Sequence, residues 1–282
     1  MRDSTRALQE AELTAEEVER ILKVCGPHAL LVGGQALATW AMYYGVQPAG
    51  ELSRVVTMDA DFIGSNATAQ KLQRSLGQPW KLRKATLDDF GPQIAKVYAT
   101  LPEHGIKQVD FLSGIVGLDT DAIRRRASQL QLEDGTTVQV LHPLDVLESR
   151  LRNLDALPSK RNAIGVAQAR LAVSVVRAFI EHYMDEAGDP RTVRQAVKRV
   201  EKLALDTQLA CVAFTYDIDV LAAIPVDRIA YSRFREEQWP RLVARLNTKR
   251  AAFERRKSRD AADGKTRRGT KRPGSSKPKI KR

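Results

Sequence analysis

The fold of this chain is set by one stretch, Val55-Val56-Thr57-Met58-Asp59-Ala60-Asp61-Phe62-Ile63. Apolar, β-branched and aromatic residues surround a run of acid, small residue, acid, which is typical of a buried strand. Residues two apart on a strand point to the same face, so Asp59 and Asp61 would project together with Thr57 beside them. An exposed edge strand with two surface acids fits the same pattern, and the pair taken alone favours that simpler interpretation.

Two carboxylates on one face of a strand repel each other unless a positive charge lies between them. Each raises the pKa of the other. A divalent cation removes the repulsion, and hard oxygen ligands suit magnesium. The spacing of Asp59 and Asp61 therefore indicates a metal site, provided that other parts of the chain complete it.

Two further segments favour the metal site over the surface strand. Upstream, residues 29–38 read as an apolar strand, then Gly33 and Gly34, then a helix. Glycines at such a turn let the backbone approach a ligand, and the helix N-terminus favours phosphate, although a tight turn with positive φ is the simpler alternative. Downstream, residues 106–112 predict a second strand that places Asp110 on its polar face between apolar neighbours. A surface acid is the alternative for Asp110.

Together these segments resemble the nucleotidyltransferase superfamily that shares the fold of DNA polymerase β, and most closely its AbiEii-type and minimal nucleotidyltransferase branches. The family pattern of paired glycines, two acids on one strand and a third acid on a later strand matches Gly33, Gly34, Asp59, Asp61 and Asp110. The resemblance covers about residues 25–165. It implies an α+β fold with a mixed sheet flanked by helices. Many members of these branches are toxins of toxin–antitoxin or phage-defence systems, so an antitoxin partner is also implied.

The resemblance implies magnesium-dependent transfer of NMP from an NTP to an acceptor hydroxyl on RNA, such as tRNA, or on a protein. Asp59 and Asp61 would bridge two Mg²⁺ ions, with Mn²⁺ as an alternative, and Asp110 would bind the catalytic ion and help to deprotonate the acceptor. The residues expected to contact the nucleotide are Gly33, Gly34, Thr57 and Arg150.

Two departures from the family pattern support a second hypothesis. Arg150, on a helix expected over residues 143–151, stands where the branch carries lysine, and the run Lys160-Arg161-Asn162 lacks the aspartate that should follow its arginine. These departures favour a catalytically silent domain that binds nucleic acid or a protein partner. The intact set of three acids favours an active enzyme.

Composition limits the class of protein. The chain has 282 residues, enough for two domains, and a 43% hydrophobic content that can build a substantial core. A net charge of +12 suggests a polyanionic partner, either nucleic acid or nucleotide. Two distant cysteines, Cys25 and Cys211, favour a reduced, cytoplasmic compartment. We expect no membrane span, because no apolar run approaches the ~18 residues that one needs.

Three parts are expected along the chain: a catalytic domain over residues 1–142, a helical domain over 143–254 and a disordered basic tail over 255–282. The tail holds 13 Lys or Arg and two Asp, a net +11, with almost no apolar residue. It would bind polyanions without sequence preference or serve only as a solubilising extension. The sequence leaves the oligomeric state open.

Several charged or polar motifs outside the site have structural explanations. Asp88 and Asp89 lie beside turn residues, and Asp119 suits the first turn of a helix. A solvated helix face explains the basic stripe from Arg191 to Lys202 better than a dedicated RNA site does. Proline should kink or break the last helix at Trp239-Pro240. The four histidines are too scattered for a metal cluster, namely His28, His104, His142 and His182.

Overall fold

The protein was analysed as a computed structural model, which describes residues 11–47, 59–86, 88–89, 91–101, 105–185 and 188–269. The chain divides into two compact units, Met1–Arg228 and Ile229–Arg282. The predicted boundary at residue 142 falls inside the first unit, between its last strand and the helix that follows, and remains a prediction. Thr57 and the first half of the acid strand lie outside the described residues.

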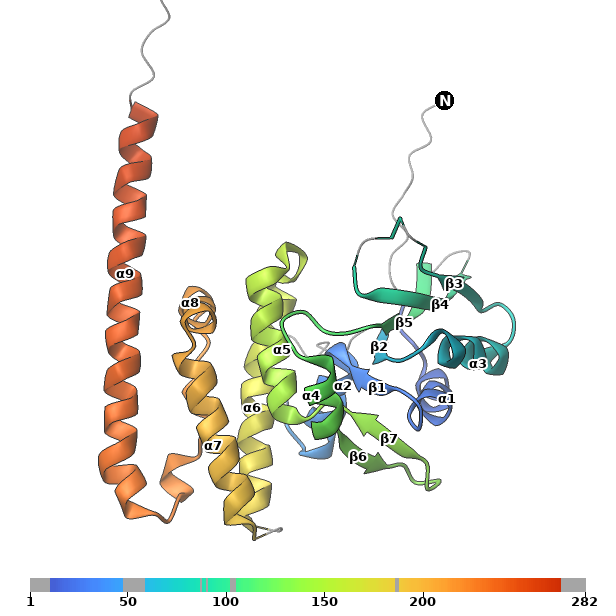
Figure 1. Ribbon diagram of the computed structural model, residues 1–282, viewed down its shortest axis with the longest axis horizontal. Helices are drawn as coiled ribbons and strands as arrows, with labels where there is room; N and C mark the ends of the chain where they lie inside the picture. Colours follow the sequence, from blue (N-terminus) through green and yellow to red (C-terminus); the bar gives the residue numbers. More distant parts are fainter. Residues whose placement is uncertain are drawn as a thin grey trace, which may run out of the picture. The chain divides into compact units, whose positions relative to one another are not determined.

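A seven-stranded mixed sheet forms the centre of the first unit, in the order β3-β4-β5-β2-β1-β7-β6 (Figure 1). Its strands are β1 Leu30–Val32, β2 Ala60–Ile63, β3 Lys81–Lys84, β4 Gln93–Leu101, β5 Gly105–Leu112, β6 Ser128–Gln131 and β7 Thr137–Val140. The two central pairings that matter for the site are β1 with β2, antiparallel, and β2 with β5, parallel. The three predicted site segments are therefore neighbours in the sheet.

Helices flank this sheet, which confirms the predicted α+β class (Figure 1). They are α1 Ala15–Cys25, α2 Gly33–Tyr43, α3 Asn66–Leu76, α4 Thr120–Arg126, α5 Pro143–Ala156, α6 Ala163–Asp185, α7 Pro190–Leu205 and α8 Thr207–Thr215. Helices α1 and α3 pack together, while α2 packs against α5 and α6. Short 3₁₀ segments, Pro158–Lys160, Val220–Ala223 and Val226–Arg228, join or follow the later helices.

Most of the predicted local signals have the expected geometry. Thr14 and Glu17 form a reciprocal capping box at the start of α1, with N–O distances of 2.7 and 3.2 Å. Asp119 caps α4, and Asp89 accepts the backbone N–H of Thr86 at 2.9 Å. Ser65 caps α3, and its hydroxyl accepts the Thr68 N–H.

Helix α6 differs from the expectation that the chain has no long apolar run. It is 23 residues long and apolar enough to pass a test for a membrane span. More than half of the tested window is buried inside the protein, against α5, α7 and α2 among others. This burial is that of a core helix, which passes the same test by length and composition.

The second unit consists of a π-helical turn, Phe234–Gln238, and the long helix α9, Trp239–Gly269. Pro240 lies just after the π-helical turn, so the predicted irregularity is present there. Helix α9 continues past Arg255, where the basic tail was expected to start, and the boundary at residue 254 remains a prediction. The segment contains Ala261 and Ala262, and the first proline after Arg255 is Pro273, so nothing stops the helix earlier. Residues 270–282 lie outside the described residues.

Candidate metal and nucleotide site

The sheet register brings the three predicted acids together. Asp61 on β2 lies opposite Asp110 on the parallel neighbour β5, and opposite Val32 at the end of β1. Asp59 stands in a bend just before β2. One carboxylate oxygen from each of Asp59, Asp61 and Asp110 lies within 4.8 Å of the other two. The surface-strand alternative is therefore excluded, since all three side chains are half-buried and converge.

This convergence is electrostatically unfavourable for the acids. Burial raises the pKa of Asp61 to about 7, and repulsion from Asp59 and Asp110 contributes to the same shift. Burial also raises the pKa of Asp110, with a further contribution from Asp59, while Lys96 and Gln93 act in the opposite direction. A cation between the carboxylates would relieve this repulsion.

Asp110 differs from the other two acids because it has protein partners. Gln93 on β4 donates its side-chain N–H to Asp110 Oδ1 at 2.5 Å, and Lys96 Nζ lies 3.7 Å from the same oxygen. Among the described residues, neither Asp59 nor Asp61 forms an ion pair with Lys or Arg. The donor set is thus three carboxylates, two of them lacking a cationic partner there, which fits a hard divalent ion such as Mg²⁺ or Mn²⁺.

Gly33 is required by the close approach of Asp61. Its φ is +68°, a conformation that other residues rarely adopt. A Cβ placed on Gly33 would lie only 2.0 Å from Asp61 Oδ2. The glycine therefore lets the strand-to-helix turn pass directly over the acid strand. Glycine is needed at this position both for the positive φ of the turn and for the space that Asp61 occupies.

The same glycine begins α2, whose N-terminus has no side-chain cap. Gly34 is buried in the first helical turn. The first N–H groups of a helix lack partners within the helix and carry partial positive charge. Placed beside the acid cluster, they can donate hydrogen bonds to the oxygens of a phosphate group.

Arg150 on α5 is a buried cation that interacts electrostatically with Asp61 and Asp59. It is 6% exposed and donates from Nη1 to Gln168 Oε1 at 3.0 Å, while its Nε has no partner among the described residues. Burial lowers the pKa of Arg150, and the negative charges of Asp61 and Asp59 oppose this shift. Arg150 thus acts on the acids through their electrostatic field and not through a direct ion pair.

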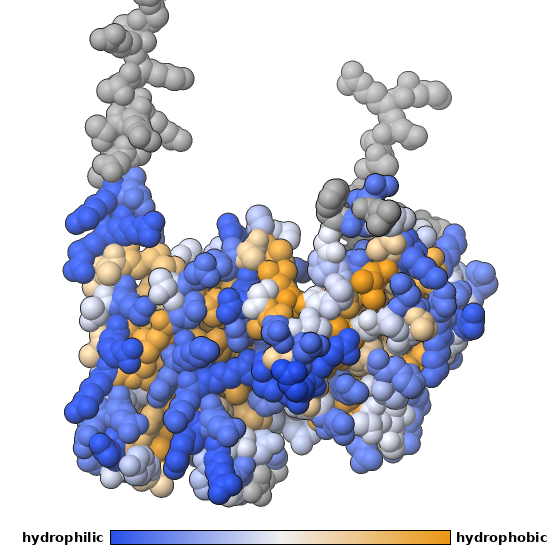
Figure 2. Space-filling view, viewed as in Figure 1, coloured by the Kyte–Doolittle hydropathy of each residue, from blue (hydrophilic) through white to orange (hydrophobic). Residues whose placement is uncertain are grey.

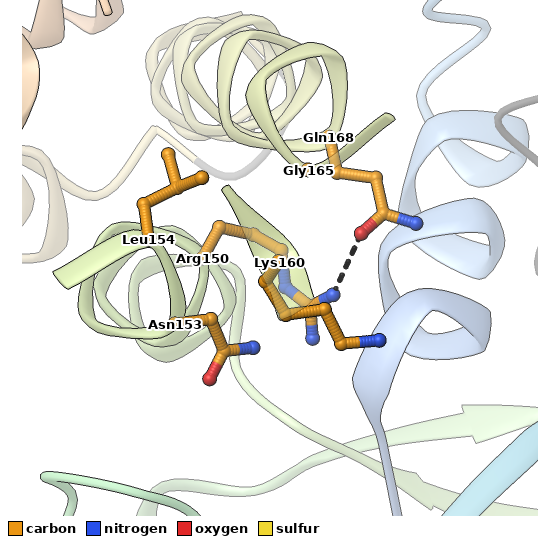
Figure 3. A pocket seen from close by; sticks show the side chains of 6 residues that line it. All are labelled: Arg150, Asn153, Leu154, Lys160, Gly165 and Gln168. Carbon is orange, nitrogen blue, oxygen red and sulfur yellow. Dashed lines mark hydrogen bonds between the residues drawn. The ribbon is translucent and has the colours of Figure 1, made fainter. Parts of the chain in front are cut away.

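Arg150 lines a small pocket together with Lys160 and Gln168 (Figure 3). The other lining residues are Asn153, Leu154 and Gly165. Figure 3 shows the Arg150 and Lys160 side chains extending in the same direction, with the hydrogen bond from Arg150 to Gln168. Lys160 also lowers the pKa of Asp61, so two cations face the acid cluster from the helical side.

Sequence reasoning missed the polar partners of the acids. Gln93 and Lys96 reach Asp110 because β4 pairs with β5, and a bulge between Gln93 and Ala95 changes the register within that pairing. Gln93 and Lys96 are three positions apart, so a regular strand would place them on opposite faces, and the bulge that brings both to Asp110 has no sequence signal. His142 caps α5 by accepting the Leu144 N–H, and burial lowers the pKa of His142 to about 4.

No family model and no curated protein matches the chain. Among solved structures, it is similar to the Megavirus polyadenylate synthase (10% identity, TM-score 0.37), with 61% of this chain aligned to 36% of the viral enzyme. The chain thus spans about a third of that protein.

Two similar structures come from Helicobacter pylori. One is a proposed nucleotidyltransferase (12% identity, TM-score 0.35, 85% of this chain and 94% of that one), and the other is JHP933 (10% identity, TM-score 0.33, 88% and 94%). At these identities and TM-scores, none of the three likenesses assigns this chain to a family.

Proposed function

We propose that this protein is a divalent-metal-dependent nucleotidyltransferase that moves NMP from an NTP to an acceptor hydroxyl. The observation that supports this most is the cluster of Asp59, Asp61 and Asp110, whose carboxylate oxygens lie within 4.8 Å of one another beside the start of α2. Asp59 and Asp61 would hold the metal ions, with Asp110 completing the site. When bound, the ions supply charge neutralisation for the phosphates and the leaving group.

The residues of the chain have distinct roles in this proposal. Backbone N–H groups at Gly33 and Gly34 donate hydrogen bonds to phosphate oxygens, and Arg150 on α5 adds positive charge. The acceptor oxygen forms a bond to the α-phosphorus as the bond to pyrophosphate breaks. The acceptor proton passes to the Asp110 carboxylate. The assignment of Thr57 to the nucleotide remains a prediction, because that residue lies outside the described residues.

A transfer assay tests this proposal. The protein is incubated with Mg²⁺, each of the four α-labelled NTPs, and either total RNA or a cell lysate. We expect labelled RNA or protein with the wild type and at least a ~100-fold lower rate with Asp59→Asn or Asp61→Asn, because each removes a ligand charge without changing shape. Asp88→Asn, an acid in an exposed turn, is the matched control. Near wild-type transfer by either site variant would refute the assignment.

The acceptor and the biological role belong to the same proposal. The acceptor is RNA, such as tRNA, or a protein, and the resemblance to toxin-like branches suggests a toxin with an antitoxin partner in the cytoplasm. Expression of the wild type in a bacterial host would then slow growth, and Asp61→Asn would not. Equal growth inhibition by both proteins would show that the toxicity does not depend on Asp61.

One structural observation favours the catalytically silent alternative. Asp110 Oδ1 already accepts a hydrogen bond from Gln93 and lies near Lys96, and both compete with a metal for that oxygen. Under this alternative the cluster is stabilised by protein cations alone and the protein acts by binding a partner. Gln93→Leu distinguishes the two, since it should leave or improve metal affinity in an enzyme that binds metal at Asp110.

A further inference from the structure

The net positive charge of the chain comes from its second unit. Residues 229–282 hold 19 Lys or Arg and five Asp or Glu, a net +14, whereas residues 1–228 are slightly acidic at −2. The overall charge of +12 therefore does not belong to the unit with the acid cluster. A charge asymmetry of this size between parts of one chain is typical of a segment that contacts a polyanion.

Within that unit, the charge is organised along α9. The residues with described side chains, 239–260, include eight Lys or Arg and two acids. At 3.6 residues per turn, five of the eight fall within an arc of about 100°. These five form what we call the arginine face: Arg241, Arg245, Arg255, Arg256 and Arg259. Glu254 and Asp260 lie outside this arc, so the face carries one sign of charge between residues 239 and 260.

The arginine face is open to solvent. All five side chains are exposed, and among the described residues none of them forms an ion pair or a hydrogen bond. On α7, by contrast, one of the basic residues, Arg199, pairs with Asp145 and Glu148 of the protein itself. Figure 2 shows hydrophilic residues over much of α9, interrupted by paler and apolar ones. In the described part of the chain, no acidic side chain therefore pairs with the arginine face.

We propose that the arginine face of α9 binds the phosphate backbone of nucleic acid. From Arg241 to Arg259 the helix rises about 27 Å, enough to meet several successive phosphates. All five cations are arginine, whose planar guanidinium matches phosphate in two-point contacts. Binding through the backbone alone would give little sequence preference and a strong dependence on salt.

The composition of α9 favours nucleic acid over an anionic membrane. A helix that lies on a membrane needs a broad apolar face. The large apolar side chains of α9 end at Phe253, and Leu242 is already buried within the protein. The part that carries Arg255, Arg256 and Arg259 has only alanine as an apolar neighbour through residue 269.

Binding of the full-length protein to a mixed-sequence single-stranded RNA of about 20 nucleotides tests this inference, with affinity measured by fluorescence anisotropy from 50 to 200 mM salt. The test variant is Arg245→Gln with Arg256→Gln and Arg259→Gln, since glutamine preserves helix propensity. The matched control removes three exposed cations from α7: Arg191→Gln, Arg194→Gln and Lys198→Gln. Circular dichroism and melting temperature confirm that both proteins stay folded.

We expect the α9 variant to bind about 10- to 100-fold more weakly at ~0.1 M salt. The slope of log K against log salt should become shallower by about 2, at ~0.7 for each phosphate that the three removed arginines no longer neutralise. The α7 control should stay within ~2-fold of the wild type, and single-stranded DNA should bind within ~10-fold of RNA.

Three results would overturn the inference: equal weakening in both variants, no RNA binding by the wild type, or equal affinity for phosphatidylserine-containing vesicles. No NTP is present in this experiment. A failure here therefore leaves the proposed transfer reaction standing, and a failure of the transfer assay leaves this result unaffected.

Discussion

At the scale of single residues, Asp61 is the centre of the site. It pairs across the sheet with Asp110, follows Asp59 by two positions, and contacts the turn at Gly33. No described cation pairs with it, and its pKa of about 7 means that a proton partly occupies the position where a metal would sit at neutral pH. Metal and proton should therefore compete at this residue.

The raised pKa of Asp61 predicts how stability changes with pH in the metal-free protein. The unfolded chain has an ordinary aspartate pKa near 4, so the folded state binds more protons between about pH 4 and 7. Stability must then fall as pH rises through this window. In EDTA, we expect a lower melting temperature at pH 8 than at pH 5.5, and Asp61→Asn should reduce this difference. A difference of the same size in Asp61→Asn would assign the effect to another group.

The turn at Gly33 predicts a large cost for any side chain there. Gly33→Ala places a Cβ against the Asp61 carboxylate in addition to forcing a positive φ. Gly45→Ala is a matched control, because φ is +64° there and nothing lies within 4 Å of the new Cβ. We expect the control to lower the free energy of unfolding by about 1–2 kcal/mol. Gly33→Ala should lower it by at least ~1 kcal/mol more, as measured by urea denaturation. Equal effects would mean that the turn can move away from Asp61.

At the scale of elements, a buried ionic group joins the helices that follow the sheet. Asp145 on α5 is fully buried and accepts Arg126 Nη2 from α4 at 2.7 Å, with a further contact from Arg199 of α7. Burial raises the pKa of Asp145, but the hydrogen bonds from Arg126 and Arg199 outweigh it, so the pKa lies below its ordinary value. This group fixes α5, and with it Arg150, relative to the neighbouring helices.

Removal of that buried carboxylate should be strongly destabilising. Asp145→Ala leaves the two arginines without their shared partner, and removing one side of a buried pair typically costs about 3–5 kcal/mol. Asp185→Ala is the control, since Asp185 pairs with Arg228 at the surface and should change stability little. The free energy of unfolding of both variants decides this. A change below ~1 kcal/mol for Asp145→Ala would show that the helices are held by their apolar contacts alone.

The elements also show what the sequence could and could not reveal. The acid pair was predictable, because the period of a strand places residues 59 and 61 on one face, and the capping box at Thr14 is a purely local signal. The contacts of Gln93 and Lys96 with Asp110 were not, because they depend on strand pairing and on a bulge. The extent of α9 was not predictable from composition, because low hydrophobicity indicates disorder while the lack of proline before Pro273 permits a helix.

At the scale of the whole molecule, the acid cluster and the net positive charge lie in different units. The acid cluster and the pocket at Arg150 lie in residues 1–228, while the net positive charge lies in residues 229–282. A strongly basic surface around the acid cluster would itself compete for the carboxylates. Our two proposals therefore place the metal site in one unit and the polyanion-binding surface in the other.

This division predicts the effect of truncation after Glu254, which removes a net charge of +11. Because residues 255–282 contain none of the proposed site residues, nucleotide affinity and the melting temperature should be unchanged. RNA affinity should fall, with a shallower dependence on salt. Calorimetry with NTP and anisotropy with RNA measure the two effects separately. Equal RNA affinity and salt slope would place the polyanion site elsewhere, with the stripe from Arg191 to Lys202 the next candidate.

We propose that Asp59, Asp61 and Asp110 together hold a divalent metal, which Mn²⁺ binding followed by electron paramagnetic resonance can detect at this site. We expect that the wild type and Asp88→Asn take up Mn²⁺ at pH 7.5, that Mg²⁺ displaces it, and that Asp61→Asn weakens binding by at least ~10-fold. Mn²⁺ binding that is equally strong in Asp61→Asn, or absent from the wild type, would contradict it.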